Sequence, residues 1–593
     1  MWSVLLSVAA LFLGVWMVPF ARRVPVWFSA IDGFVLAGIT GLVAFTLLPE
    51  SLTEGGIFAI AALICGSFVP RFLEHRETPR ADVEHTPWIV VLAVSGLAIH
   101  GFIDGTAFAG SAHPEGAEHE ILGLAVLLHR LPVGLALGML WGGGKARASW
   151  GAAVVVACAT LGGYWAGMET LPALGHQGLA VFQAFVVGTL IHVIFAHSPL
   201  TSAMRTGRTR LFGGLGALLG LCAVVWAIRE HPIPAHCSQE LAMIESVFGL
   251  FLKISPAVVA MMFVWGAAVA VLPRWQIRGS DSPLKQALVG VFMGWSLPVA
   301  SVGVQARYGK LMRRGGPKLA GLAFLLAAPT ASIEVLWISW PLLGWPGTLI
   351  RVVSALLFAG LLALVAAGFL NTPTQKNDHP FHEPRDPALS RWKLGFFQGP
   401  AELVSHLFPW LTGGLLVAGC ANAALHEGAL VGVPAVFQVF LAVAAATPFY
   451  FCPVGFTPVM AVLVAKGLSV GSAIAMLFVG PIVGGVTHRE WVALHGRPVA
   501  LGLQTAVVAG ALMMGVAIDQ VWLGIGFQIP ELVTSGAADW RWSSPEVIAG
   551  SVLGVVGCTS LLQHGPRAWV DQLYGPFVGG ESCELHHHDH AHH

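Results

Sequence analysis

Three side chains that can ligate metal stand in sequence that is otherwise as apolar as a lipid bilayer: His100, Asp104 and His129. His100 and Asp104 are four residues apart, so on a helix they share one face. His129 lies on the next apolar run, just before Pro132, where a proline frees backbone carbonyls. Each ionisable residue inside a membrane costs roughly 2.5 to 3.5 kcal/mol on insertion scales, so three on adjacent spans indicate a site inside a helix bundle. Two imidazoles and a carboxylate suit zinc and similar divalent ions.

The composition indicates an integral membrane protein made of helices. Of the 593 residues, 56% are hydrophobic and only 10% are charged, whereas soluble domains carry about 25% charged residues. Apolar runs of about 20 residues recur along the chain, the length that a membrane helix needs. The formal net charge is zero, so nucleic acid is not an expected partner. The eight cysteines show no paired spacing, which argues against a disulfide framework or a zinc ribbon.

The basic residues predict the topology of the N-terminal part. They fall in alternate loops between the apolar runs, and loops rich in Lys and Arg are typically cytoplasmic. We therefore expect eight spans within residues 1–228, with the N-terminus outside an inner membrane of bacterial type. A polar, proline-broken stretch at 229–240 reads as a periplasmic linker. These basic residues are Arg22, Arg23, Arg71, Arg76, Arg80, Lys145, Arg147, Arg205, Arg208 and Arg210.

Residues 1–228 resemble the Zrt/Irt-like (ZIP) family of metal transporters. The resemblance rests on HGFIDG, which begins at His100, and on HRLPVG, which begins at His129. It implies an eight-helix bundle with a metal site between two helices. Arg130 and Val133 stand where the family carries glutamates, and Gly101 stands where it carries asparagine, so its two-metal centre is not intact.

Two arrangements of this N-terminal site remain open. Either His100, Asp104 and His129 hold one ion, or Arg130 neutralises Asp104 and no metal binds. His192 and His197 either line the same cavity or are buried histidines with satisfied hydrogen bonds.

An internal repeat organises residues 241–520. Residues 298–329 match residues 450–481 at an offset of 152, and the copies span about 255–370 and 407–520. Duplicated halves with broken apolar segments are typical of transporters, whose substrate site lies where the breaks meet. The residues expected to form these breaks and gate the path are Pro298, Gly303, Pro329, Pro448, Pro453, Gly455 and Pro481.

Two further side chains in this region are candidates for cation chemistry. Glu334 follows the break at Pro329, where a buried carboxylate would bind a cation or a proton; the alternative is a carboxylate at the membrane edge. Cys452 lies between Pro448 and Pro453, where a thiolate would suit copper or zinc; the alternative is a small buried apolar side chain.

Residues 240 to 520 resemble a bacterial predicted-permease family that includes organoarsenical and proposed copper/zinc efflux permeases. The resemblance rests on the Pro298–Gly303 break, on Leu326–Pro329 and on Cys452 with Thr457–Pro458. Two cysteines of the family's first copy are replaced by Ala300 and Val302, which weakens the inference of soft-metal chemistry.

The C-terminus combines one further span with a chelating tail. A membrane helix is expected within residues 521–570, and residues 571–593 end in ESCELHHHDHAHH. Interruptions of the histidine run at Asp589 and Ala591 argue against an expression tag and favour a flexible metal-capturing tail. The expected ligands are Cys583, His586, His587, His588, Asp589, His590, His592 and His593.

Together these patterns predict an all-α polytopic membrane protein, a transporter and not an enzyme. The leading hypothesis is efflux of zinc or copper ions by alternating access, with the metal as substrate and no cofactor. One alternative is a permease for organo-element compounds in which the ZIP-like region is a scaffold or regulator. Others are a metal-dependent hydrolase, for which no HExxH pattern exists, and a metal sensor. Expected partners are the lipid bilayer and metal ions, and a homo-oligomer is left open.

Overall fold

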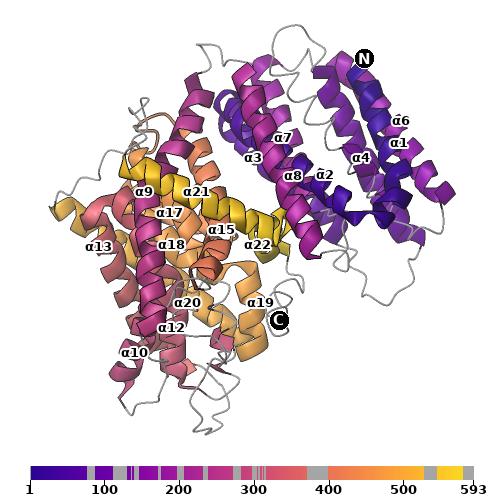
Figure 1. Ribbon diagram of the computed structural model, residues 1–593. Helices are drawn as coiled ribbons and strands as arrows, with labels where there is room; N and C mark the ends of the chain where they lie inside the picture. Colours follow the sequence, from indigo (N-terminus) through magenta and orange to yellow (C-terminus); the bar gives the residue numbers. More distant parts are fainter. Residues whose placement is uncertain are drawn as a thin grey trace. The chain divides into compact units, whose positions relative to one another are not determined.

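The computed structural model describes sixteen stretches of the chain, and every regular element in them is a helix (Figure 1). Nine helices in these stretches are long and apolar enough to cross a membrane, which confirms the expected all-α, multi-pass architecture. The described residues are 2–75, 87–110, 130–131, 133–134, 137–138, 146–170, 175–196, 206–230, 238–271, 282–296, 304, 307–309, 311–312, 316–369, 399–525 and 544–578.

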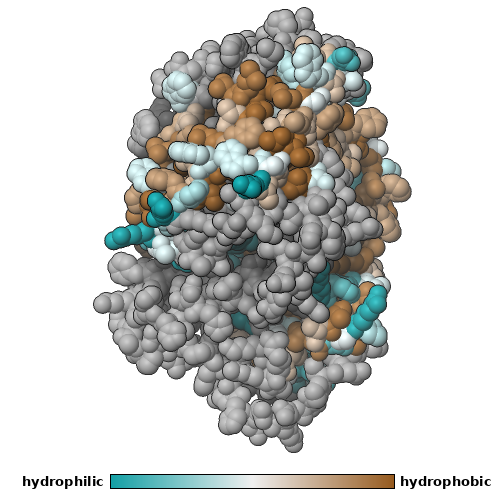
Figure 2. Space-filling model, turned by 90° about the vertical axis from the view of Figure 1, so that its right-hand side faces the viewer, coloured by the Kyte–Doolittle hydropathy of each residue, from teal (hydrophilic) through white to brown (hydrophobic). Residues whose placement is uncertain are grey.

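Many large apolar side chains face outward, as lipid contact requires. Trp16, Leu219 and Trp226 are each about two-thirds exposed. Figure 2 shows hydrophobic side chains gathered over much of the described surface on one side of the molecule. In water such patches would be a liability, but in a bilayer they are the expected outer surface.

The chain divides into two compact units. Unit 1 comprises Met1–Ile244 together with Cys558–Tyr574, and unit 2 comprises Glu245–Gly557 together with Gly575–His593. Unit 1 therefore includes a short segment from near the C-terminus of the chain.

The helices of unit 1 pack in pairs that are distant in sequence. Helix α2 packs on α8, α3 on α7, and α4 on α6. A π-helical turn, η1, joins α2 to α3, and α3 bends at Gly56, whose φ of 55° suits glycine. The helices are α1 (Trp2–Arg23), α2 (Pro25–Leu42), η1 (Val43–Leu47), α3 (Leu48–His75), α4 (Pro87–Gly110), α6 (Ala146–Thr170), α7 (Gly175–Ala196) and α8 (Gly207–Glu230).

Unit 2 combines long helices with shorter ones, several of which begin at a proline or a glycine. Its central core is formed by α12, α13, α18 and α20. The helices are α9 (Ser238–Val271), α10 (Pro283–Ser296), α12 (Lys318–Ala331), α13 (Ile333–Ala366), η4 (Ala367–Phe369), α15 (Gly399–Ala424), α16 (Ala435–Ala446), α17 (Pro453–Ala465), α18 (Val470–Val483), α19 (Gly485–His495), α20 (Arg497–Ile525) and α21 (Pro545–His564). The last helix, α22 (Pro566–Val578), lies mostly in unit 1.

Close glycine contacts set the spacing of α15 and α17. A Cβ atom added at Gly414 would stand 1.8 Å from the backbone oxygen of Gly455, and one added at Gly455 would stand 2.2 Å from that of Trp410. Backbone atoms cannot move aside as a flexible side chain can. The two helices can therefore pack at this distance only with glycine at both positions.

We expect Gly414→Ala to destabilise unit 2 by about 1 to 3 kcal/mol, because the added methyl group forces α15 away from α17. Gly502→Ala in α20 is the matched control, since a Cβ there meets no atom within 4 Å. The measurement is the yield and melting temperature of the purified full chain in detergent. Equal behaviour of the two variants would show that the α15–α17 contact is looser than the structure indicates.

Candidate functional site

The two copies in unit 2 break their helices in the same way. Helix α12 is followed by a break at Ser332, with φ −56° and ψ 153°, and α18 by a break at Gly484, with φ −53° and ψ 160°. Ser332 and Gly484 are separated by the same 152 residues that relate the sequence copies. Pro329 and Pro481 each lie three residues before the break. Because an internal proline removes a helical hydrogen bond, it weakens the helix close to where both helices end.

A second pair of breaks follows at the same offset. Gly344 bends α13 with φ 68° and ψ 179°, and Gly496 separates α19 from α20 with φ 83° and ψ 158°. Only glycine adopts such backbone angles without strain. The first part of α13 thus corresponds to α19, and its second part corresponds to α20.

The two prolines that precede the first pair of breaks, Pro329 and Pro481, both line a small hollow inside unit 2. About 180 Å³ of space lies between its lining atoms, and none of that space is wide enough for a water molecule. Its lining is apolar except for the Thr487 hydroxyl and the Trp491 indole. The lining residues are Val304, Leu325, Pro329, Pro481, Ile482, Thr487 and Trp491.

Glu334 and Cys452, the expected cation ligands, are both buried beside breaks. Glu334 is in the first turn of α13, directly after Ser332, and is 4% exposed. Cys452 is the residue before α17 and is 5% exposed. Protein atoms therefore shield the Glu334 carboxylate from solvent. The structure does not bring either residue into a group of three or more His, Cys, Asp or Glu side chains within its described ranges.

The other expected gating residues are placed only in part. Pro453 and Gly455 lie in the first turn of α17 and are buried, whereas Pro448 is exposed. Pro298 and Gly303 lie outside the described residues.

A buried cation that the sequence analysis did not single out lies beside these breaks. Arg351 is 0% exposed, and its Nη1 donates hydrogen bonds to Ser339 Oγ at 2.7 Å and to Thr457 Oγ1 at 2.8 Å. On a straight helix, twelve residues would separate Arg351 from Ser339 by about 18 Å along the axis. The bend at Gly344 is what brings the two side chains together. The available signal was a lone arginine in the apolar run from Leu336 to Leu364.

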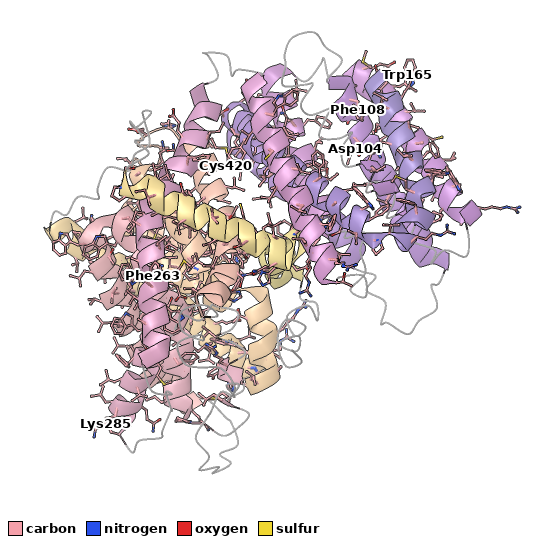
Figure 3. The ribbon with its side chains drawn as sticks, viewed as in Figure 1. Asp104, Phe108, Trp165, Phe263, Lys285 and Cys420 are labelled. Atoms are coloured by element: carbon pink, nitrogen blue, oxygen red, sulfur yellow. The ribbon has the colours of Figure 1, made fainter. Side chains whose placement is uncertain are left out.

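In unit 1, Asp104 faces an arginine. Nη2 of Arg130 lies 2.9 Å from Oδ2 of Asp104, and the two side chains are 1% and 0% exposed. The same nitrogen donates to Thr160 Oγ1 at 3.0 Å. Figure 3 marks Asp104 on α4. This geometry corresponds to the alternative in which Arg130 neutralises Asp104.

Glycines on α4 and α6 let these two helices approach each other closely beside this ion pair. A Cβ added at Gly105 would stand 2.0 Å from the Thr160 backbone oxygen, and one at Gly163 would stand 1.9 Å from that of Phe102. The close approach of the helices brings Thr160 within reach of Arg130. As a result both charged groups are sealed from solvent.

The remaining expected metal ligands are mostly outside the described part of the chain. His192 on α7 is buried at 2% exposure. His129, His197 and the side chain of His100 are outside the described residues. The C-terminal tail is outside them as well: Cys583, His586, His587, His588, Asp589, His590, His592 and His593.

Comparison with known proteins bears on the C-terminal part of the chain. No curated protein and no solved structure gives a match. Residues 1–228 give no match to the ZIP family, so the comparisons do not support that resemblance. Residues 240–520, which include every break described above, match the ArsP_1 family, whose description is predicted permease. This part of the chain is therefore similar to a family of membrane permeases, which supports a transport role for the protein.

Proposed function

We propose that the protein is a membrane transporter whose substrate path runs through unit 2, between the paired helix breaks. The observation that carries the proposal is the single hollow lined by both Pro329 and Pro481, the prolines that precede the paired breaks. In duplicated transporters, rocking of one half against the other opens such a point to each side of the membrane in turn. The match to a predicted-permease family covers this region.

Unit 1 then serves as a scaffold or regulator. A cation entering beside Asp104 would meet Arg130, whose guanidinium lies 2.9 Å from the carboxylate. Two like charges in a low-dielectric bundle repel strongly. This argues against metal passage through the ZIP-like site.

The cargo that best fits this arrangement is a small organo-element compound. The lining of the hollow is mostly apolar, and both cysteines of the family's first-copy break are replaced in this chain, by Ala300 and Val302. The second candidate is efflux of zinc or copper ions across an inner membrane, with no resident cofactor. It is favoured by the buried Glu334 carboxylate and the buried Cys452 thiol, and by the histidine-rich tail as a collector of ions.

The test is flux into proteoliposomes that carry the full chain, with phenylarsonate, phenylarsine oxide, zinc and copper(I) as separate probes. Thr487→Phe places a bulkier side chain in the hollow. It should lower flux of the transported probe about tenfold or more, because the two repeat halves can no longer close around the substrate. Thr505→Phe is the matched control, since Thr505 is exposed on α20 of the same unit.

Each outcome decides one part of the proposal. If no probe enters faster than into empty liposomes, the protein is not a transporter of these classes. If flux is saturable but Thr487→Phe leaves it unchanged, the path does not cross the hollow. Zinc or copper flux that Thr487→Phe blocks would favour the metal candidate over the organo-element one.

A further inference from the structure

Arg351 uses only part of its hydrogen-bonding capacity within the described structure. Its Nη1 is held by the Ser339 and Thr457 hydroxyls. Its Nε and Nη2 are buried and have no hydrogen-bond partner among the described residues. These two nitrogens form one edge of the planar guanidinium group, and that edge is a complete two-pronged donor for an oxyanion.

The same chain shows what this edge binds when a partner is present. In unit 1, Arg567 donates from Nε to Asp32 Oδ2 at 2.7 Å and from Nη2 to Asp32 Oδ1 at 2.5 Å. Arg351 presents the same pair of nitrogens, but its hydrogen-bond partners within the described ranges are neutral hydroxyls on its other nitrogen.

A fully buried arginine with only neutral partners is costly to keep for stability alone. Charged groups inside a membrane normally pair with an opposite charge, and those that do not usually mark a substrate or ion path. The two hydroxyls do not depend on the arginine, since Ser339 Oγ also donates to the Val335 oxygen and Thr457 Oγ1 to the Pro453 oxygen. The described part of the chain therefore orients Arg351 without supplying a counter-charge.

The repeat places this group at the counterpart of the hollow. Ser339 is the first-copy equivalent of Trp491, a lining residue of the hollow, at the offset of 152 residues. Thr457 lies one turn into α17, five residues after Cys452 in the second-copy break. Arg351 thus joins the first copy to the break of the second copy.

We propose that Arg351 binds an oxyanion group of the transported substrate through its Nε and Nη2 atoms. This rests on the proposed transport function and narrows its cargo to compounds that carry a carboxylate, phosphonate or arsonate group. Arg351 is also the residue that disfavours a bare metal cation on this path.

The decisive experiment is binding of phenylarsonate and of benzoate to the purified full chain in lipid nanodiscs, measured by titration calorimetry. The two ligands separate a tetrahedral oxyanion from a planar one. We expect saturable binding of at least one, weakened about 100-fold by Arg351→Met and about tenfold by Arg351→Lys, which keeps the charge but loses the fork. Arg497→Met, at an exposed arginine that begins the corresponding helix α20, should bind as the parent does.

A thermal unfolding series shows whether Arg351 is instead a structural residue. Because Arg351→Met removes an unneutralised buried charge and leaves both hydroxyls hydrogen-bonded, its melting temperature should equal or exceed that of the parent. A large fall in melting temperature together with unchanged oxyanion binding would overturn the proposal. Absence of binding of both oxyanions to the parent would overturn it as well.

These outcomes are separable from failure of the transport function. If Thr487→Phe blocks flux of zinc or phenylarsine oxide but no oxyanion binds, the protein is a transporter and Arg351 does not bind its substrate. If oxyanion binding depends on Arg351 but no probe is transported, Arg351 is a binding site and the proposed transport function is wrong.

Discussion

We expect Asp104→Ala to lower the free energy of unfolding of unit 1 by about 3 to 5 kcal/mol, because it leaves the buried Arg130 without its counter-charge. Both side chains are at most 1% exposed. The measurement is thermal unfolding of the full chain in detergent. Glu169→Ala, at an exposed carboxylate on α6, is the control and should change stability by less than about 0.5 kcal/mol.

A double variant separates an ion pair from a metal site. Asp104→Leu combined with Arg130→Met replaces both charges with apolar groups and should restore most of the lost stability, since a buried pair is often no better than a well-packed apolar one. Zinc should not shift the melting temperature of the parent through this site. If zinc stabilises the parent and Asp104→Ala abolishes that shift without other loss, Asp104 is a metal ligand and the ion-pair interpretation is wrong.

The second large effect is expected at the ion pair between Asp32 and Arg567. The two residues are 535 positions apart in sequence, yet both prongs of the guanidinium bind the carboxylate. Asp32 is 4% exposed and Arg567 is 11% exposed. Asp32→Ala should therefore cost about 3 to 5 kcal/mol and release the C-terminal segment from unit 1.

Limited proteolysis and hydrogen exchange of residues 566–574 would measure this release. Glu54→Ala, at an exposed carboxylate on α3 of the same unit, is the matched control. If the amide hydrogens of α22 exchange no faster in Asp32→Ala than in the parent, packing and not the ion pair holds the helix in place.

The charge of Arg567 is secure over the pH range of such measurements. Burial lowers the pKa of its guanidinium, but the nearby carboxylates of Asp32 and Asp571 raise it by more, so the net shift is upward. A group whose pKa is raised by folding contributes stability below its unfolded-state pKa and loses it only as pH rises through the higher folded value. The stability that the charged guanidinium of Arg567 contributes is thus expected to remain throughout neutral and mildly alkaline pH.

The sequence by itself determined the fold class and revealed the internal repeat. Helices and membrane spans follow from local composition, because every backbone polar group in a bilayer must find its partner within the segment. Proline and glycine act locally too, so the offset of 152 residues that relates Pro329 to Pro481 recurs in the backbone angles of Ser332 and Gly484. The resemblance to a permease family, read from the same region, agrees with the match to residues 240–520.

Only the tertiary structure decided which charges meet. The sequence left open whether Asp104 holds metal or faces Arg130, since both arrangements satisfy the same spacing on adjacent helices. It offered no reason to join Asp32 to Arg567, and it passed over Arg351, whose two hydroxyl partners lie 12 residues before it and 106 residues after it. A buried charge acquires its role from the groups packed around it. Those groups come from parts of the chain that only folding brings together.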